Sequence, residues 1–185
     1  MRNKSPIVLI FVLLLSCASH QGFYYPSGSF SEDSRTDHFK YDWYVDHLKS
    51  MKEKPLVEIT SSKALRILVL PTSGRPEVLR LSAEQNGVYQ LFYLQTNGVG
   101  GGQSGEIIAE KRKSISNELV EEIFSQANDH CNIGSAKSHG VIESEEGEQW
   151  VLEWLNDGRL HAFDLWSPQK GCFFNLYKQL SALIS

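Results

Sequence analysis

Three side chains able to share acid–base chemistry lie close together near the C-terminus of this 185-residue chain: Glu153, His161 and Asp164. A histidine beside a carboxylate is the usual arrangement of a general base that activates water or a nucleophile. The three residues fall on two runs of alternating character separated by Asp157-Gly158, which predicts a β-hairpin with a two-residue loop. In that register His161 points to one face of the hairpin and both carboxylates point to the other. The pattern therefore favours a structural histidine, with a hydrolase using His161 and Asp164 or Glu153 as the alternative.

The His161 face of the same hairpin is predicted to be apolar. Its cross-strand pairs are Trp154 with His161, Leu152 with Phe163, and Trp150 with Leu165. A three-residue loop would instead set Asp164 against Trp150 and bury an unpaired charge. If exposed, Trp150, Trp154 and Trp166 would form the stacking platform of a saccharide-binding module. Because two of them share a face with Leu152 and Phe163, we expect burial. The predicted core hairpin thus comprises Trp150, Leu152, Trp154, His161, Phe163 and Trp166.

A glycine-rich segment, residues 97–105, has the GxGxxG spacing of a dinucleotide-binding loop at Gly100, Gly102 and Gly105. Such a loop joins a strand to the helix N-terminus that receives the pyrophosphate. Residues 106–110 instead resemble another strand, and no Lys-Ser/Thr pair closes the segment as in a phosphate-binding P-loop. The sequence therefore predicts a mobile hairpin loop and no cofactor.

The three cysteines divide into Cys17, near the N-terminus, and the pair Cys131 and Cys172. In an oxidising compartment the pair could close a disulfide, which would stabilise the fold by roughly 4 kcal/mol. The alternative is two buried thiols that never meet. A metal site that adds His130 and His139 is disfavoured, because His130 and Cys131 are adjacent and would diverge by about 100° on a helix. We expect a disulfide and no metal.

The N-terminus has the pattern of a secretory signal peptide over residues 1–16. Arg2 and Lys4 precede an unbroken apolar run at residues 7–15, and small residues follow. Nine apolar residues rise only about 14 Å as a helix, whereas the hydrocarbon core of a bilayer is roughly 30 Å thick. This segment therefore predicts export and not a membrane span.

Residues 14–17, Leu-Leu-Ser-Cys, resemble the lipobox of bacterial lipoproteins. The resemblance implies that Cys17 is diacylated, becomes the mature N-terminus and anchors the chain to a membrane. Ala18 after the cysteine suits an outer-membrane lipoprotein that faces the periplasm. Ordinary cleavage after Ala18 would instead give a secreted or soluble periplasmic protein.

The first part of the mature chain is predicted to stand apart from the main domain. Residues 17–35 are rich in Ser, Gly and Pro without apolar periodicity, which predicts a flexible tether. Residues 36–54 are predicted to form an N-terminal helix that Thr36 or Asp37 caps, because apolar residues recur there at helical spacing. We expect this helix at the edge of the domain formed by residues 55–185.

Residues 55–185 predict an α+β domain with a single antiparallel, meander-type sheet of about six strands and two helices packed on it. The expected strands lie at 56–60, 65–70, 78–83, 88–95, 106–110, 139–143 and in the core hairpin. The expected helices are 117–129, which Ser116 caps, and a closing helix that begins near Gly171.

The segments Gln149-Trp150-Val151-Leu152-Glu153 and Leu160-His161-Ala162-Phe163-Asp164-Leu165-Trp166-Ser167-Pro168 resemble a motif of an uncharacterised bacterial family. Members of that family have the motif W-x-L-E-G followed by the motif Y-H-x-x-D-R-W-S-P, and a leucine-rich helix closes the chain. This chain has Leu160 in place of that Tyr and Leu165 in place of that Arg, which weakens an ion-pair or anion-binding role beside Asp164. The resemblance implies a fold and no activity.

Composition and charge reduce the number of function classes that the chain could belong to. Without Arg2 and Lys4, the chain has 16 basic and 22 acidic side chains. The basic residues 111–113 are balanced by Glu106, Glu110 and Glu118, so nucleic-acid binding is not expected. We expect a non-catalytic, membrane-tethered envelope protein that binds another protein, for example in an immunity or inhibitor role against a toxin. The exported hydrolase and the saccharide-binding module are the alternatives.

Overall fold

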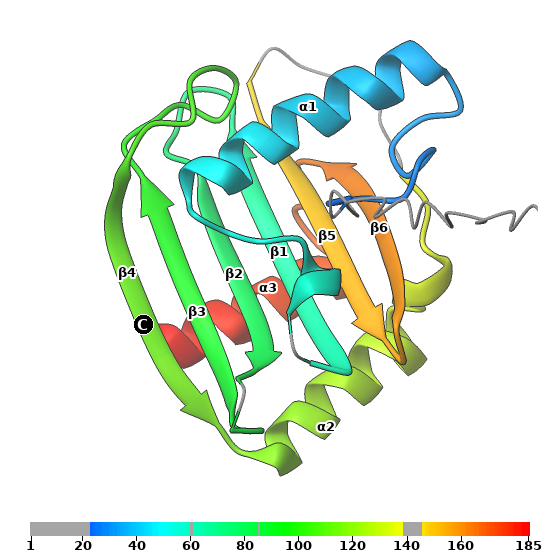
Figure 1. Ribbon diagram of the computed structural model, residues 1–185, viewed down its shortest axis with the longest axis vertical. Coiled ribbons are helices and arrows are strands. Elements are labelled where there is room, and N and C mark those ends of the chain that lie inside the picture. Colours follow the sequence, from blue (N-terminus) through cyan, green and yellow to red (C-terminus); the bar gives the residue numbers. More distant parts are fainter. Residues whose placement is uncertain (1–22, 60, 85, 139–145) are drawn as a thin grey trace, which may run out of the picture.

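The computed structural model describes residues 23–59, 61–84, 86–138 and 146–185. Within these ranges one antiparallel sheet has the strand order β4-β3-β2-β1-β5-β6 (Figure 1). Its strands are β1 (Lys63–Pro71), β2 (Glu77–Ala83), β3 (Tyr89–Thr96), β4 (Ile107–Ile115), β5 (Glu148–Asn156) and β6 (Arg159–Trp166). The α-helices are α1 (Ser34–Ser50), α2 (Asn117–Ser125) and α3 (Cys172–Ile184). The predicted α+β fold, with a single antiparallel sheet of about six strands, is confirmed.

Strand β1 lies at the centre of the sheet, between β2 and β5. From it the chain meanders through β2 and β3 to the edge strand β4, and α2 then returns it to β5 beside β1. Helix α1 covers one face of the sheet, while α2 and α3 contribute to the core on the other (Figure 1). Coverage on both faces explains why β1 reads as an almost continuous apolar run. In the described part of the chain, no helix has the length and apolarity needed to cross a bilayer.

The β5–β6 hairpin has the predicted two-residue register. Trp154 lies opposite His161, Leu152 opposite Phe163 and Trp150 opposite Leu165. Asp157 and Gly158 have φ angles of 49° and 74°, as a two-residue turn with two left-handed positions requires. The alternation of the two strands therefore assigns each side chain to the expected face.

The face covered by α2 and α3, called the apolar face below, holds the larger hydrophobic core. Trp150, Leu152, Trp154 and Phe163 of the hairpin are buried there against both helices. Ser116 caps α2 by accepting a hydrogen bond from the backbone N–H of Leu119 at 3.3 Å, as predicted.

The face covered by α1, called the α1 face below, also buries part of the segment that was expected to be a flexible tether. Tyr25 and Phe30 are 2% and 3% exposed and pack edge-to-face against each other. The backbone N–H groups of Gly28 and Phe30 donate hydrogen bonds to the carboxylate of Asp37 at 2.8 and 2.9 Å. Residues 23–33 are thus folded onto the domain, because buried aromatic rings offset the ordering of a segment whose composition is typical of a linker.

Helix α1 also differs from its predicted start and position. Asp33, rather than Thr36 or Asp37, caps it by accepting a hydrogen bond from the backbone N–H of Thr36 at 2.9 Å. Its buried residues pack across the α1 face: Tyr44, Val45, His47 and Leu48. The expected edge position is therefore wrong.

Two of the predicted short strands are not found as strands in the described residues. Residues 56–58 form a 3₁₀ turn, Leu56–Glu58, and Leu56 is fully buried in a small cluster with Ala64 and Leu155. One anchoring residue satisfies this segment without sheet pairing, so the strand predicted over 56–60 is wrong for its described part. The strand predicted over 139–143 lies outside the described residues.

The glycine-rich segment forms the β3–β4 connection and packs closely on the end of β1. A Cβ atom at Gly100 would lie 2.4 Å from the backbone oxygen of Pro71, so only glycine fits there. The indole Nε1–H of Trp43 donates a hydrogen bond to the Gly100 carbonyl at 2.9 Å. The hairpin connection is as predicted, but close packing and the bond from α1 anchor a loop that was expected to be mobile.

The disulfide between Cys131 and Cys172 is present, with a Cα–Cα distance of 5.3 Å. It joins the residue after the π-helical turn that follows α2 to the first residue of α3. The bridge therefore holds together the two helices that cover the apolar face. Because both thiols are consumed, the metal site considered with His130 and His139 loses its sulfur ligands, and the described residues hold no other candidate metal cluster.

Candidate ligand site on the α1 face of the sheet

The structure does not bring together the three acid–base residues of the hairpin. His161 lies toward the apolar face, where its Nε2 is 2.6 Å from the backbone oxygen of Ala136. Glu153 and Asp164 lie on the α1 face, where each contacts different cationic or hydroxyl groups. The two carboxylates and the imidazole diverge as the register predicts, so neither Glu153 nor Asp164 orients the imidazole.

Asp164 connects β6 to α1. Its Oδ2 accepts hydrogen bonds from the Tyr44 hydroxyl at 2.6 Å and from Nζ of Lys40 at 2.7 Å. Asp164 is fully buried and Lys40 nearly so. Burial, reinforced by the Asp164 carboxylate, raises the pKa of Tyr44 far above its ordinary value, so this hydroxyl acts as a donor. The role of Asp164 is therefore to fix α1 on the sheet.

Glu153 forms a fully buried bidentate pair with Arg66 across the β5–β1 ladder. The two nitrogen–oxygen distances are 2.7 and 2.6 Å, and both side chains are 0% exposed. Arg66 Nη1 also donates to Glu53 at 3.0 Å and to the backbone oxygen of Lys54 at 2.7 Å. Burial alone would lower the pKa of Arg66, but the two carboxylates raise it above its ordinary value and keep the guanidinium charged.

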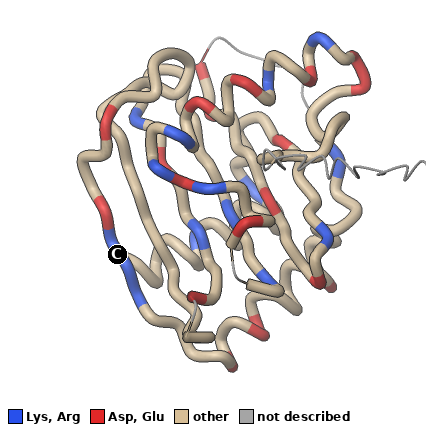
Figure 2. The backbone as a smooth tube through the Cα atoms, in the orientation of Figure 1, with Lys and Arg blue, Asp and Glu red and all other residues tan. Residues whose placement is uncertain are grey.

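A second arginine, Arg80 on β2, extends this network toward solvent. Its Nε donates to the same Oε2 atom of Glu53 at 2.8 Å, and its Nη1 donates to the hydroxyl of Ser82. Glu53 is thus shared by two guanidinium groups and links the segment that follows α1 to β1 and β2. Figure 2 shows basic and acidic residues alternating along that segment where it crosses the sheet.

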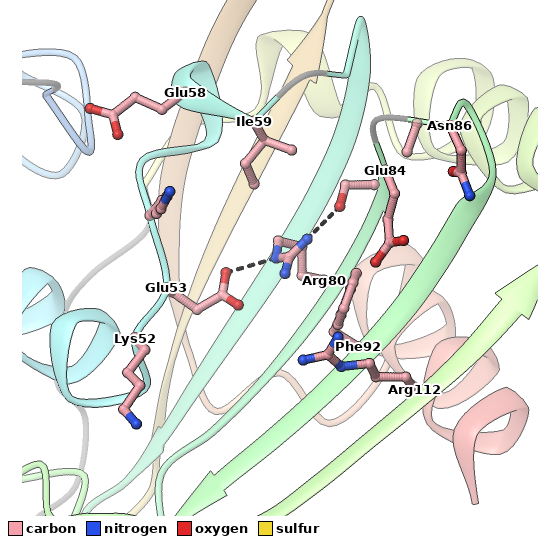
Figure 3. Close-up of a pocket in the computed structure, with 12 residues that line it drawn as sticks. Lys52, Glu53, Glu58, Ile59, Arg80, Glu84, Asn86, Phe92 and Arg112 are labelled. Atoms are coloured by element: carbon pink, nitrogen blue, oxygen red, sulfur yellow. Dashed lines mark hydrogen bonds and ion pairs between the residues drawn. The ribbon is translucent and has the colours of Figure 1, made fainter.

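Beside Arg80 the α1 face is hollowed into a pocket of about 610 Å³ (Figure 3). Phe92 on β3 stands between Arg80 on β2 and Arg112 on β4, because these residues are paired across the ladder. The guanidinium carbons lie 4.0 and 5.2 Å from the centroid of the Phe92 ring, which is cation–π geometry for both. We call these three residues the Arg–Phe–Arg row.

The pocket lining has more cationic than anionic groups. Its cations are Lys52, Lys54, Arg80 and Arg112, and its carboxylates are Glu53, Glu58 and Glu84. Glu53 pairs with Arg66 and Arg80, and Arg66 also pairs with Glu153, so these four charges balance and the lining keeps an excess of one positive charge. Arg112 lies at the outer edge, where it pairs with Glu110 at 2.6 Å, both side chains being largely exposed. The arrangement is suited to hold an anion.

The tryptophans are not available for sugar stacking. Trp150 and Trp154 are 2% and 4% exposed. Trp150 packs against Phe174 and Tyr177, and Trp154 packs against Phe124. Trp166 remains partly exposed but has no second exposed indole beside it in the hairpin. The expected burial is confirmed for Trp150 and Trp154 but not for Trp166, and these residues do not form a platform of stacked tryptophans.

The residues of the candidate pocket were not identified from the sequence. A usable signal was present for the buried network behind the pocket, because Arg66 and Glu153 are opposite charges inside two otherwise apolar strands. Two such residues are buried together only if they pair. The pocket also depends on Glu53 and Arg112, which no local pattern connects to those strands.

Comparison with known proteins does not assign the chain to a family. No protein-family model matches the chain, and no curated protein is significantly similar to it. The resemblance of the hairpin to an uncharacterised bacterial family therefore stays a prediction.

Proposed function

We propose that this protein is an exported, lipid-anchored envelope protein that acts by binding, with another protein as its principal partner. The signal-peptide pattern of residues 1–16 and the lipobox-like residues up to Cys17 support the export and the anchor. The Cys131–Cys172 disulfide is consistent with an oxidising compartment such as the periplasm. An outer-membrane location facing the periplasm is the version we favour.

The observation that carries the binding role is the division of the hairpin's acid–base groups between two faces of the sheet. Each group has a structural partner: His161 contacts the Ala136 carbonyl, Glu153 pairs with Arg66, and Asp164 bonds to Tyr44 and Lys40. Catalysis by these residues would need them within hydrogen-bonding reach of one another. Binding needs only an accessible surface, for example that of an inhibitor or an immunity protein.

The anchor is tested by growing a double-membraned bacterial host on radiolabelled palmitate. The wild-type chain is expected to carry label and to fractionate with the outer membrane, and Cys17→Ser is expected to lose both. The double variant Cys131→Ser/Cys172→Ser is the control, because it removes two thiols and leaves the lipobox intact. An unlabelled wild-type chain that begins at Ser19 would contradict the anchor.

The binding role is tested by affinity capture of the full lipidated chain from a detergent extract of the envelope. We expect one protein to be retained reproducibly, and the purified partner to bind saturably at micromolar concentration or below, about −8 kcal/mol. Repeated captures without a specific, saturable partner would contradict a protein-binding role.

A further inference from the structure

Arg80 is a partly desolvated cation with donor capacity to spare. Its Nε and Nη1 are bonded to Glu53 and Ser82, but no described residue accepts a hydrogen bond from its Nη2. The side chain is 15% exposed and lies in the pocket wall (Figure 3). A guanidinium held by two other bonds is pre-oriented, so less side-chain entropy is lost when the remaining nitrogen binds an acceptor.

Arg112 supplies a second cation at the mouth of the same pocket. Its only ion pair among the described residues is with Glu110, at an exposed position where such pairs contribute little stability. An incoming anion can therefore displace Glu110 at small cost. Because Arg80 and Arg112 flank Phe92, an anion bound by both would lie over the Arg–Phe–Arg row.

The volume and the remaining lining favour a molecule larger than a bare ion. About 610 Å³ is within the range of small-molecule sites, roughly 300–1,000 Å³, and is far larger than an inorganic anion needs. Ile59, Ala83 and Phe92 give one part of the wall apolar character. Glu58 and Glu84 also belong to the lining, and neither forms an ion pair with Arg80 or Arg112 within the described residues.

We propose that this pocket binds a small organic anion, whose carboxylate or phosphate group accepts hydrogen bonds from Arg80 and Arg112 and whose apolar body contacts Ile59 and Phe92. The inference deepens the proposed binding role by adding a ligand site on the protein itself. A carboxylate and a phosphate share the acceptor geometry that a guanidinium recognises, and the experiment distinguishes them.

The test is a ligand-detected NMR titration of the full-length chain in a non-ionic detergent. The probes are benzoate, phenyl phosphate, acetate, inorganic phosphate, neutral benzyl alcohol and cationic benzylammonium. We expect benzoate or phenyl phosphate to bind several-fold more tightly than the other four, and the tighter of the two identifies the headgroup. Binding should weaken as salt rises from about 50 to 500 mM, because an exposed ion pair is screened.

Arg112→Gln is the decisive variant, and Lys111→Gln is its matched control. Both remove one positive charge from an exposed position of β4, but Lys111 lies opposite Tyr93 on the other face of the sheet. We expect Arg112→Gln to weaken binding about tenfold and Lys111→Gln less than twofold, since one charge-assisted hydrogen bond is lost only in the former. Unchanged thermal unfolding of both variants verifies that the fold is retained.

Several results would overturn the proposal. They are the failure of both aromatic anions to bind, equal binding of benzyl alcohol or benzylammonium, equal binding of the two bare anions, or equal losses in Arg112→Gln and Lys111→Gln. None of these depends on palmitate labelling or on protein capture. Failure of the pocket can therefore be told apart from failure of the proposed envelope role.

Discussion

The two faces of the sheet are stabilised in different ways. The apolar face is a continuous hydrophobic core, in which hairpin residues such as Trp150 and Phe163 pack against α2 and α3. Among the described residues, the α1 face buries four charged side chains, Glu53, Arg66, Glu153 and Asp164, together with its apolar ones. A hydrophobic core tolerates substitutions that conserve its volume, whereas a buried charge is strongly destabilising unless it is paired.

This difference indicates that the α1 face is the one whose geometry is specified in detail. Glu53 joins the end of α1 to β1 and β2, and Asp164 joins β6 to the middle of α1. The buried pairs contribute little net stability in comparison with apolar residues of the same shape, but they strongly disfavour other positions of α1. The same pairs hold Arg80 at the wall of the candidate pocket. Substitutions on each face therefore test the comparison.

The largest effect is expected for Glu153→Gln, compared with Leu152→Met on the next residue of β5. Glu153→Gln is nearly isosteric but leaves the buried Arg66 guanidinium without its bidentate partner, so we expect a loss of about 3–5 kcal/mol in the free energy of unfolding. Leu152→Met conserves volume on the apolar face and is expected to cost less than about 1.5 kcal/mol. Urea unfolding measures both. Similar losses for the two variants would remove the distinction between the faces.

The second effect is expected on the apolar face, from the double variant Cys131→Ser/Cys172→Ser. Opening the bridge across 41 residues should lower the free energy of unfolding by about 2–4 kcal/mol, because the unfolded chain gains conformational freedom. Thermal unfolding with and without reductant gives the same quantity in the wild-type chain. A midpoint that is insensitive to both reductant and substitution would contradict this prediction.

A smaller loss is expected for Tyr44→Phe on the α1 face. It removes a buried hydrogen bond to an ionised carboxylate and leaves Asp164 with Lys40, so we expect a cost of about 1.5–3 kcal/mol. Tyr24→Phe is the control, because its hydroxyl bonds to the partly buried backbone oxygen of Glu53 and should contribute about 0.5–1.5 kcal/mol. Denaturant unfolding should show a larger loss in the free energy of unfolding for Tyr44→Phe than for Tyr24→Phe. The reverse order would contradict the assignment of Asp164 as the residue that anchors α1.

The smallest effect is a pH dependence from His47, a residue of α1 that is 1% exposed. Burial lowers its pKa below the ordinary value of 6.5, so the folded state holds the neutral ring while the unfolded state takes up a proton first. Stability should therefore fall as the pH drops below about 6.5. His47→Leu should lose less stability than the wild-type chain between about pH 7.5 and pH 5. His38→Leu, at an exposed position, should behave like the wild-type chain.

The sequence predicts the β5–β6 hairpin to the residue, because Asp157-Gly158 and strict alternation are local signals. It also predicts the disulfide, since the remaining cysteine is assigned to the lipobox. It fails for residues 23–33, where a linker-like composition conceals Tyr25 and Phe30, and for the start of α1, where Asp33 precedes two equally plausible caps. Composition describes the segment itself and contains no information on the surface that receives its aromatic rings.

What the sequence determined by itself is the period of the clearly alternating elements, above all the β5–β6 hairpin: which side chains share a face, where a turn occurs and which cysteines are free to pair. What only the tertiary structure decided is the partner of each buried charge. Arg66 and Glu153 are 87 residues apart, and Tyr44 and Asp164 are 120 apart. The physical reason is that alternation fixes orientation within a strand, whereas the strand order and the position of α1 follow from packing the whole sheet.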